Sequence, residues 1–160
     1  MQEDRSHHRR SIRLKGYDYS HPGAYFVTIC THEKQCLFGD VVDGQMRMTS
    51  CGETVQEEWY KSAQIRREVK LDAWIVMPNH VHGIVWILPT PQREGVGANG
   101  VCPRREGERR SPLPMRPRSL ASLVAGFKAA TTHRTNETRQ SSAGPIWQRN
   151  YYEHIIRNQR

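Results

Sequence analysis

The chain has 160 residues, a formal net charge of +8 and 36% hydrophobic residues. This length suits one domain of ordinary size with a buried core. No apolar run reaches the roughly 18 residues of a membrane span, and the N-terminus lacks the apolar segment of a secretory signal, so we expect no membrane association. The positive charge indicates a polyanionic partner, most often nucleic acid, although a basic soluble protein without such a partner would show the same balance.

The cysteines are scattered and form no C-x-x-C pair, which argues against a zinc ribbon or a redox motif. In a chain without a secretory signal they predict reduced thiols and a cytoplasmic location. The four cysteines are Cys30, Cys36, Cys51 and Cys102.

Residues 1–16 are predicted to form a basic N-terminal arm, followed by a single domain over residues 17–160. The arm includes Arg10, Arg13 and Lys15. These side chains could contact DNA phosphates or remain solvated, and the sequence leaves both readings open.

The first half of the domain predicts a strand, a hairpin and a helix. Residues 24–31 are β-branched and aromatic, as in a core strand. Residues 37–48 read as a hairpin at the domain edge, because Asp43-Gly44 suits a tight two-residue turn. Thr49 offers an N-cap for a helix that runs to about Arg67.

Two more strands follow, joined by the two residues Pro78 and Asn79. So short a link makes the strands at 69–77 and 80–88 antiparallel neighbours. The first of them alternates, which predicts one face made of Val69, Leu71, Ala73, Ile75 and Met77.

Residues 89–118 are rich in Pro, Gly and Arg and predict a disordered insert. A second helix begins at the cap Ser119 and carries an apolar stripe up to Thr131. We expect a polar loop over residues 132–144 and a last, aromatic strand within residues 145–157.

The predicted order is strand, hairpin, helix, strand, strand, helix, strand. This is an α+β fold of the ferredoxin-like, split βαβ type, with an antiparallel sheet and two helices on one face. One face of the sheet stays free. The same plan serves RNA-binding domains, so the fold does not name a function.

His80 and His82 open an apolar strand directly after the Pro78-Asn79 turn. Side chains two apart on a strand point the same way, so the two imidazoles could hold one divalent metal. The alternative is a pair of polar residues on a half-exposed face. On spacing alone both interpretations remain open.

Four stretches of the chain share a pattern with one known family: GYDYSHPGAYFVT at 16–28, MPNHVHG at 77–83, Phe127-Lys128, and Trp147-Gln148 followed by YYEHIIR at 151–157. Together they resemble the REP-associated tyrosine transposases, which are IS200-like members of the HUH endonuclease superfamily. The resemblance runs from about Arg10 to the end of the chain, apart from the Pro/Arg-rich insert.

The resemblance implies a single-stranded DNA endonuclease and strand transferase that recognises DNA hairpins. A tyrosine of the family attacks a DNA phosphate, while the two histidines, here His80 and His82, hold Mg²⁺ or Mn²⁺. Predicted DNA contacts are Arg10, Arg13, Lys15, Lys128 and Arg149.

The family's nucleophilic tyrosine lies on a helix after the Trp-Gln strand, with a third, polar metal ligand one turn later. That helix is expected beyond Arg160, so this chain is expected to retain DNA affinity with cleavage weak or absent. Tyr151 and Tyr152 fall in the strand motif, where the family's aromatic residues are structural; Tyr152 is the candidate nucleophile within the chain. A partner subunit could supply the helix, which makes a homodimer a further expectation.

A second hypothesis is a non-enzymatic module that binds DNA or RNA hairpins on the open sheet face, with Tyr25, Trp74 and Trp86 as stacking residues. It predicts binding without metal. A hydrolase of small phosphate esters is disfavoured, because no carboxylate accompanies the histidine pair in the sequence.

Overall fold

The computed structural model describes residues 17–89, 117–139 and 144–157. The predicted arm, with Arg10, Arg13 and Lys15, lies outside the described residues, as do Cys102 and residues 90–116 of the predicted insert. The elements are β1 (Gly23–Cys30), the 3₁₀ turn η1 (His32–Lys34), β2 (Gly39–Val42), β3 (Gln45–Met48), α1 (Ser50–Ile65), β4 (Val69–Met77), β5 (His80–Ile87), α2 (Leu120–Arg139) and β6 (Tyr152–Ile156).

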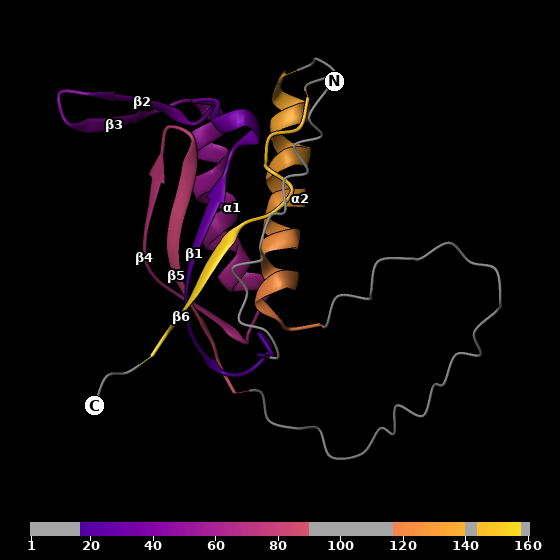
Figure 1. The fold of residues 1–160 in the computed structure, drawn as a ribbon. Helices are drawn as coiled ribbons and strands as arrows, with labels where there is room; N and C mark the ends of the chain where they lie inside the picture. The colour runs from indigo at the N-terminus through magenta and orange to yellow at the C-terminus, as the bar shows by residue number, and fades with distance from the viewer. Residues whose placement is uncertain (1–16, 90–116, 140–143, 158–160) are drawn as a thin grey trace, which may run out of the picture.

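Four strands form one antiparallel sheet in the order β4-β5-β1-β6. Helices α1 and α2 pack together on one side of this sheet (Figure 1). With the β2–β3 hairpin set aside, this is the ferredoxin-like strand order, so the predicted α+β fold is confirmed. Neither helix in the described part of the chain has the length and apolar composition needed to cross a bilayer.

The predicted hairpin forms at its Asp-Gly turn. Asp43 and Gly44 have φ angles of 53° and 75°, which a two-residue hairpin turn of this kind requires. The hairpin extends away from the end of the main sheet (Figure 1). Directly after it, the Thr49 hydroxyl accepts a hydrogen bond from the Gly52 amide at 3.3 Å and caps α1, as predicted.

The core lies between the sheet and the helices. Tyr25 and Val27 of β1 are fully buried there, and Trp59 of α1 meets the ring of Phe127 of α2 edge to face at 5.2 Å. A Cβ atom on Gly83 would stand 2.4 Å from the Trp59 ring. The glycine that follows the two histidines therefore makes room for the indole of α1.

Helix α2 is longer than predicted, since it continues to Arg139 where we expected a polar loop from residue 132. Two polar residues in its second half face the protein interior. Thr131 and Thr135 are buried, and the Thr131 hydroxyl accepts a hydrogen bond from Trp147 Nε1 at 2.8 Å. Tertiary contacts hold a helix here that the sequence pattern alone does not favour.

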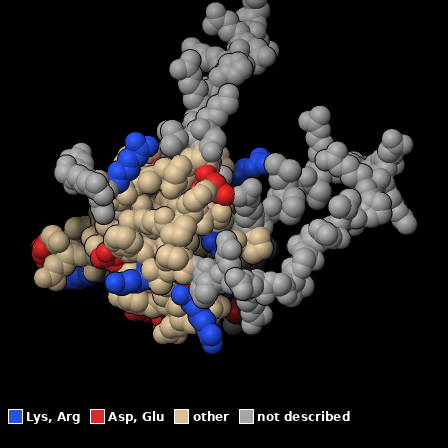
Figure 2. All heavy atoms as spheres, turned by 90° about the horizontal axis from the view of Figure 1, so that it is seen from below, with Lys and Arg blue, Asp and Glu red and all other residues tan. Residues whose placement is uncertain are grey.

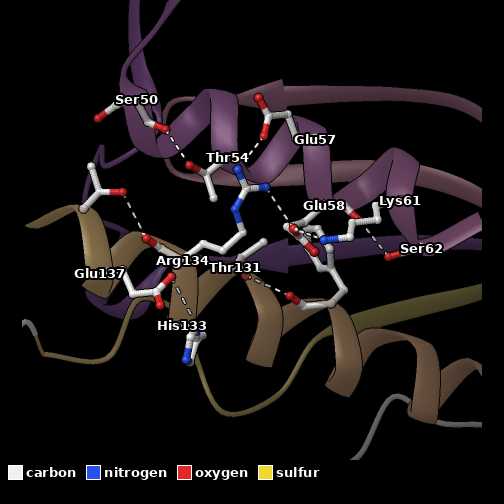
Figure 3. A network of polar contacts seen from close by, with 12 residues as sticks. Ser50, Thr54, Glu57, Glu58, Lys61, Ser62, Thr131, His133, Arg134 and Glu137 are labelled. Carbon is white, nitrogen blue, oxygen red and sulfur yellow. Dashed lines mark hydrogen bonds and ion pairs between the residues drawn. The ribbon is translucent and has the colours of Figure 1, made fainter. Parts of the chain in front are cut away.

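A polar network joins the two helices (Figure 3). The guanidinium of Arg134 donates to Glu57 Oε2 at 2.6 Å and to Glu58 Oε1 at 2.9 Å. The side chain of Glu58 is 5% exposed, and Lys61 Nζ lies 3.4 Å from its Oε1. A buried carboxylate needs such partners, so the network ties the second half of α2 to α1.

The predicted alternation of β4 is wrong beyond its midpoint. Leu71 pairs with Val85 but Trp74 pairs with Gly83, so β4 holds one extra residue at this point, a β-bulge. Beyond the bulge, each side chain of β4 points to the opposite face of the sheet from the one that strict alternation predicts. Ile75 becomes 51% exposed, while Trp74 stacks on Trp59 on the helix side.

Candidate metal and nucleic-acid site

The open face of the sheet carries the two histidines. Along β5, Val81, Gly83 and Val85 are buried toward the helices, whereas His80 and His82 are partly exposed on the opposite side. The predicted strand and its alternation therefore place both imidazoles on the face that no described helix covers.

The rings converge on each other. Nε2 of His80 lies 2.9 Å from Nε2 of His82, and the ring centroids are 4.5 Å apart at an interplanar angle of 78°. Burial, and then the neighbouring His82, lower the pKa of His80, which favours the neutral ring that can offer a lone pair.

Each ring has a polar partner at its other nitrogen. Nδ1 of His80 lies 2.6 Å from Oδ1 of Asn79, and Nδ1 of His82 lies 2.8 Å from the Thr28 hydroxyl of β1. The ring of Phe26 stacks on His82 with centroids 5.3 Å apart and planes at 24°. The strand pair β1–β5 thus holds the His82 ring in place.

The two Nε2 atoms are close enough to bind one ion together. Two ligands about 2.1 Å from an octahedral ion and at right angles are about 3.0 Å apart. The observed 2.9 Å is near this spacing, and it is also the length of a direct N–H···N hydrogen bond between the two rings. Within the described residues, no set of three His, Cys, Asp or Glu side chains is arranged to hold a metal.

Tyr152 of β6 is on the same open face. It pairs with Thr28 across the β1–β6 ladder and is 42% exposed, and Thr28 in turn contacts His82. His154, two residues further along β6, is exposed opposite Phe26. The fold therefore brings β6 side chains toward the histidine pair, which sequence spacing does not show.

Lys128 comes from α2 and Arg149 from the segment before β6. Both line an open hollow of about 590 Å³ between α2 and residues 145–149, with a lining that includes no residue of β5. Lys128 Nζ donates to the carbonyl oxygens of Gln148 at 2.8 Å and Asn150 at 3.1 Å. Its ammonium supports this segment, and its predicted DNA contact remains a prediction.

Two of the three predicted stacking residues are not on the open face. Tyr25 is fully buried under the helices, and Trp74 stacks on Trp59 because of the β4 bulge. Trp86 is 37% exposed on the open face, where its Nε1 donates to Asp72 Oδ2 at 2.9 Å.

The described domain shows no dense basic patch in the view of Figure 2, where lysines and arginines are separated by other residues. Over the described residues, Lys and Arg are nearly balanced by Asp and Glu. Most of the excess positive charge of the chain therefore lies in residues 1–16 and 90–116.

Sequence reasoning missed three residues of the site. Phe26 and Thr28 come from β1, far from the histidines in sequence, and only the β1–β5 register brings them there. The sequence indicates Asn79 as a turn residue within the MPNHVHG motif and assigns its side chain no role. The signal for such a role is its position directly before His80, because its amide oxygen can accept a hydrogen bond from a ring nitrogen.

No family model matches the sequence. Among solved structures, a REP-associated tyrosine transposase bound to a REP hairpin superposes with a TM-score of 0.54 at 22% identity. The match covers 94% of this chain, which spans 64% of the length of that transposase. At this identity the likeness concerns the fold.

Sequence comparison also finds a Haemophilus influenzae (strain Rd) protein, described only as an uncharacterized protein. It is 39% identical over 156 residues, which are 96% of this chain and 82% of that protein. Identity at this level over nearly the whole chain reflects common descent. The chain therefore belongs to the same protein family as the Haemophilus influenzae protein.

Proposed function

We propose that the chain is a DNA-processing domain of the transposase type, which binds DNA hairpins and the adjoining single strand and uses Mg²⁺ or Mn²⁺. The observation that carries the proposal is the convergence of His80 and His82 on the open sheet face, with Nε2 atoms 2.9 Å apart. The shared fold with a hairpin-bound transposase supports it.

The open face suits a single strand better than a small molecule. It is a sheet surface with partly exposed rings at Trp86 and Tyr152. Bases stack on such rings without sequence preference, while Lys and Arg outside the described residues can neutralise phosphates.

A divalent ion at the pair would supply Lewis-acid polarisation of a DNA phosphate. His80 and His82 would bind it, and the Phe26 ring would keep His82 from rotating away. Tyr152 presents a phenol on the same face. If it attacks, its oxygen bonds to phosphorus and the bond from phosphorus to the 3′ oxygen breaks. The phenol proton passes to solvent, and the freed 3′ oxygen takes a proton from solvent to become a hydroxyl.

The test uses the purified chain, a labelled hairpin oligonucleotide with a single-stranded flank, and Mn²⁺. Native gels measure binding and denaturing gels detect a covalent protein–DNA adduct. We expect hairpin binding by the wild type, tighter with Mn²⁺ than with EDTA, and loss of this metal effect in His80→Ala. Absence of any hairpin binding would overturn the proposal.

The adduct assay examines Tyr152 separately. An adduct that disappears in Tyr152→Phe and persists in Tyr151→Phe would assign the nucleophile. Retained binding without an adduct would leave this chain a metal-assisted binding domain.

A second candidate is a nucleic-acid-binding module without metal. It is favoured by one observation: among the described residues, no His, Cys, Asp or Glu side chain joins the two histidines to make a set of three. This candidate predicts that His80→Ala and EDTA leave hairpin affinity unchanged, and that Trp86→Ala weakens it.

A further inference from the structure

The side-chain amide of Asn79 is held at both ends. Its Nδ2 lies 3.2 Å from the carbonyl oxygen of Lys34, and its Oδ1 lies 2.6 Å from Nδ1 of His80. A backbone carbonyl can only accept a hydrogen bond, so the nitrogen of the amide must face Lys34. The oxygen then faces His80.

This orientation determines the tautomer of His80. Because an amide oxygen can only accept, the hydrogen must be on Nδ1 of His80. In the neutral ring Nε2 is then unprotonated, and its lone pair points toward His82 at 2.9 Å. That lone pair is what a metal ion needs.

His82 has a different kind of partner. The Thr28 hydroxyl, 2.8 Å from Nδ1 of His82, can either donate or accept. In the metal-free chain the short contact between the two Nε2 atoms needs one hydrogen, which His82 must provide, so Thr28 donates to Nδ1. An ion bound by both rings would need Nε2 of His82 unprotonated; the hydrogen of His82 would then be on Nδ1, and the Thr28 hydroxyl would accept it.

We infer that Asn79 and Thr28 are positioning residues of the histidine pair, Asn79 by holding His80 in the Nδ1–H tautomer and Thr28 by serving both tautomers of His82. The two Nε2 lone pairs can then face a single divalent cation. The part that concerns the cation rests on the proposed function, whereas the tautomer of His80 does not.

The competing explanation is that Asn79 only shapes the turn. Its backbone carbonyl accepts from the amide of Thr31 at 2.9 Å and from the Thr31 hydroxyl at 3.0 Å. These two bonds use no side-chain atom of Asn79. Substitutions of its side chain therefore leave them in place and separate the two explanations.

Long-range ¹H–¹⁵N correlation spectra of the metal-free protein, labelled at histidine, report each tautomer directly. We expect Nδ1–H for His80 and Nε2–H for His82 in the wild type. In Asn79→Ala, His80 should lose its preference for Nδ1–H, while Asn79→Asp, which keeps an acceptor, should retain it. A His80 ring protonated at Nε2 in the wild type, or unchanged in Asn79→Ala, would overturn the inference.

Mn²⁺ titrations followed by electron paramagnetic resonance supply the second readout. Loss of a partner of this kind typically weakens metal affinity 10–100-fold. We expect that loss in Asn79→Ala and Thr28→Val, and affinity near that of the wild type in Asn79→Asp and Thr28→Ser. Because an aspartate cannot donate to Lys34, a purely structural role predicts equal losses in Asn79→Ala and Asn79→Asp, which would contradict us.

The Mn²⁺ titrations and the tautomer spectra test different claims. If the wild type binds no Mn²⁺, the metal role of the pair is wrong, and the spectra still decide whether Asn79 sets the tautomer of His80. If Mn²⁺ binds but substitutions of Asn79 and Thr28 leave the histidine tautomers unchanged, the proposed function stands and this inference is wrong.

Discussion

At Gly83 the backbone of the histidine strand β5 lies against the helix layer. Its backbone lies under the ring of Trp59, and an added Cβ would meet Trp59 Cζ2 at 2.4 Å and Cη2 at 2.9 Å. The Trp59 indole is itself stacked on Trp74 and wedged against Phe127, so it has little freedom to move. The glycine after the two histidines is thus explained by packing.

Gly83→Ala should therefore destabilise the protein by about 1–3 kcal/mol, the usual cost of overpacking a core. The measurement is the free energy of unfolding from urea titration. Gly144→Ala is the matched control, because its Cβ would meet no atom within 4 Å. Equal stabilities of the two variants would show that Trp59 does not occupy this position.

The ammonium of Lys128 introduces a pH dependence. Burial lowers the pKa of Lys128 to about 8, while the nearby Cys30 acts in the opposite direction. A lysine in the unfolded chain keeps its proton to a pH of about 10.4. Between these two values the unfolded state binds more protons, so the stability of the folded state rises with pH.

We expect the unfolding free energy of the wild type to increase relative to that of Lys128→Met as the pH rises from 8 to 10. Chemical denaturation at several pH values measures the difference. Parallel pH profiles would mean that Lys128 keeps its ordinary pKa. The Lys128→Met reference cancels the contribution of other groups that titrate alike in both proteins.

At the scale of elements, Arg134 makes a polar link between α2 and α1. Arg134 bonds both the exposed Glu57 and the buried Glu58 (Figure 3). Without it, Glu58 would keep, among the residues that the structure describes, only the long side-chain contact to Lys61 at 3.4 Å. Removing one partner of a buried carboxylate costs more than removing a surface ion pair.

Arg134→Met should lower the unfolding free energy by about 1–3 kcal/mol, since the buried Glu58 carboxylate loses its hydrogen bond from the guanidinium. Glu57→Gln, at a side chain 62% exposed, should change it by less than about 0.5 kcal/mol. Thermal denaturation of the two variants provides the comparison. A larger loss in Glu57→Gln would locate the important bond at the surface.

At the scale of the whole molecule, charge and fold are carried by different parts of the chain. The described domain is nearly neutral, and the arm at 1–16 contributes a large share of the excess positive charge. If the proposed DNA binding is right, the arm supplies salt-dependent affinity while the sheet face supplies the chemistry.

Deleting residues 1–16 removes Arg5, Arg9, Arg10, Arg13 and Lys15. Each phosphate contact contributes about 0.7–0.9 to the slope of log affinity against log salt, so the slope should fall by as much as about 4. Fluorescence anisotropy with a labelled hairpin over a KCl series measures it. His80→Ala should leave the slope unchanged; an unchanged slope in the deletion would exclude the arm from binding.

The sequence by itself determined the order of elements, the hairpin at Asp43-Gly44, the cap at Thr49 and the shared face of His80 and His82. These features follow from local rules. Positive φ angles need particular residues, a hydroxyl can cap a helix, and a strand alternates its side chains. Each rule concerns neighbours in the chain.

Tertiary structure alone decided the rest. The second half of α2 is helical because Thr131, Thr135 and Arg134 find partners outside the helix. A bulge in β4, invisible to alternation, removed Trp74 from the open face. Strand register placed Thr28 against His82, and Tyr152 beside Thr28 on the same face. These outcomes depend on contacts between residues distant in sequence, whose energies no local pattern contains.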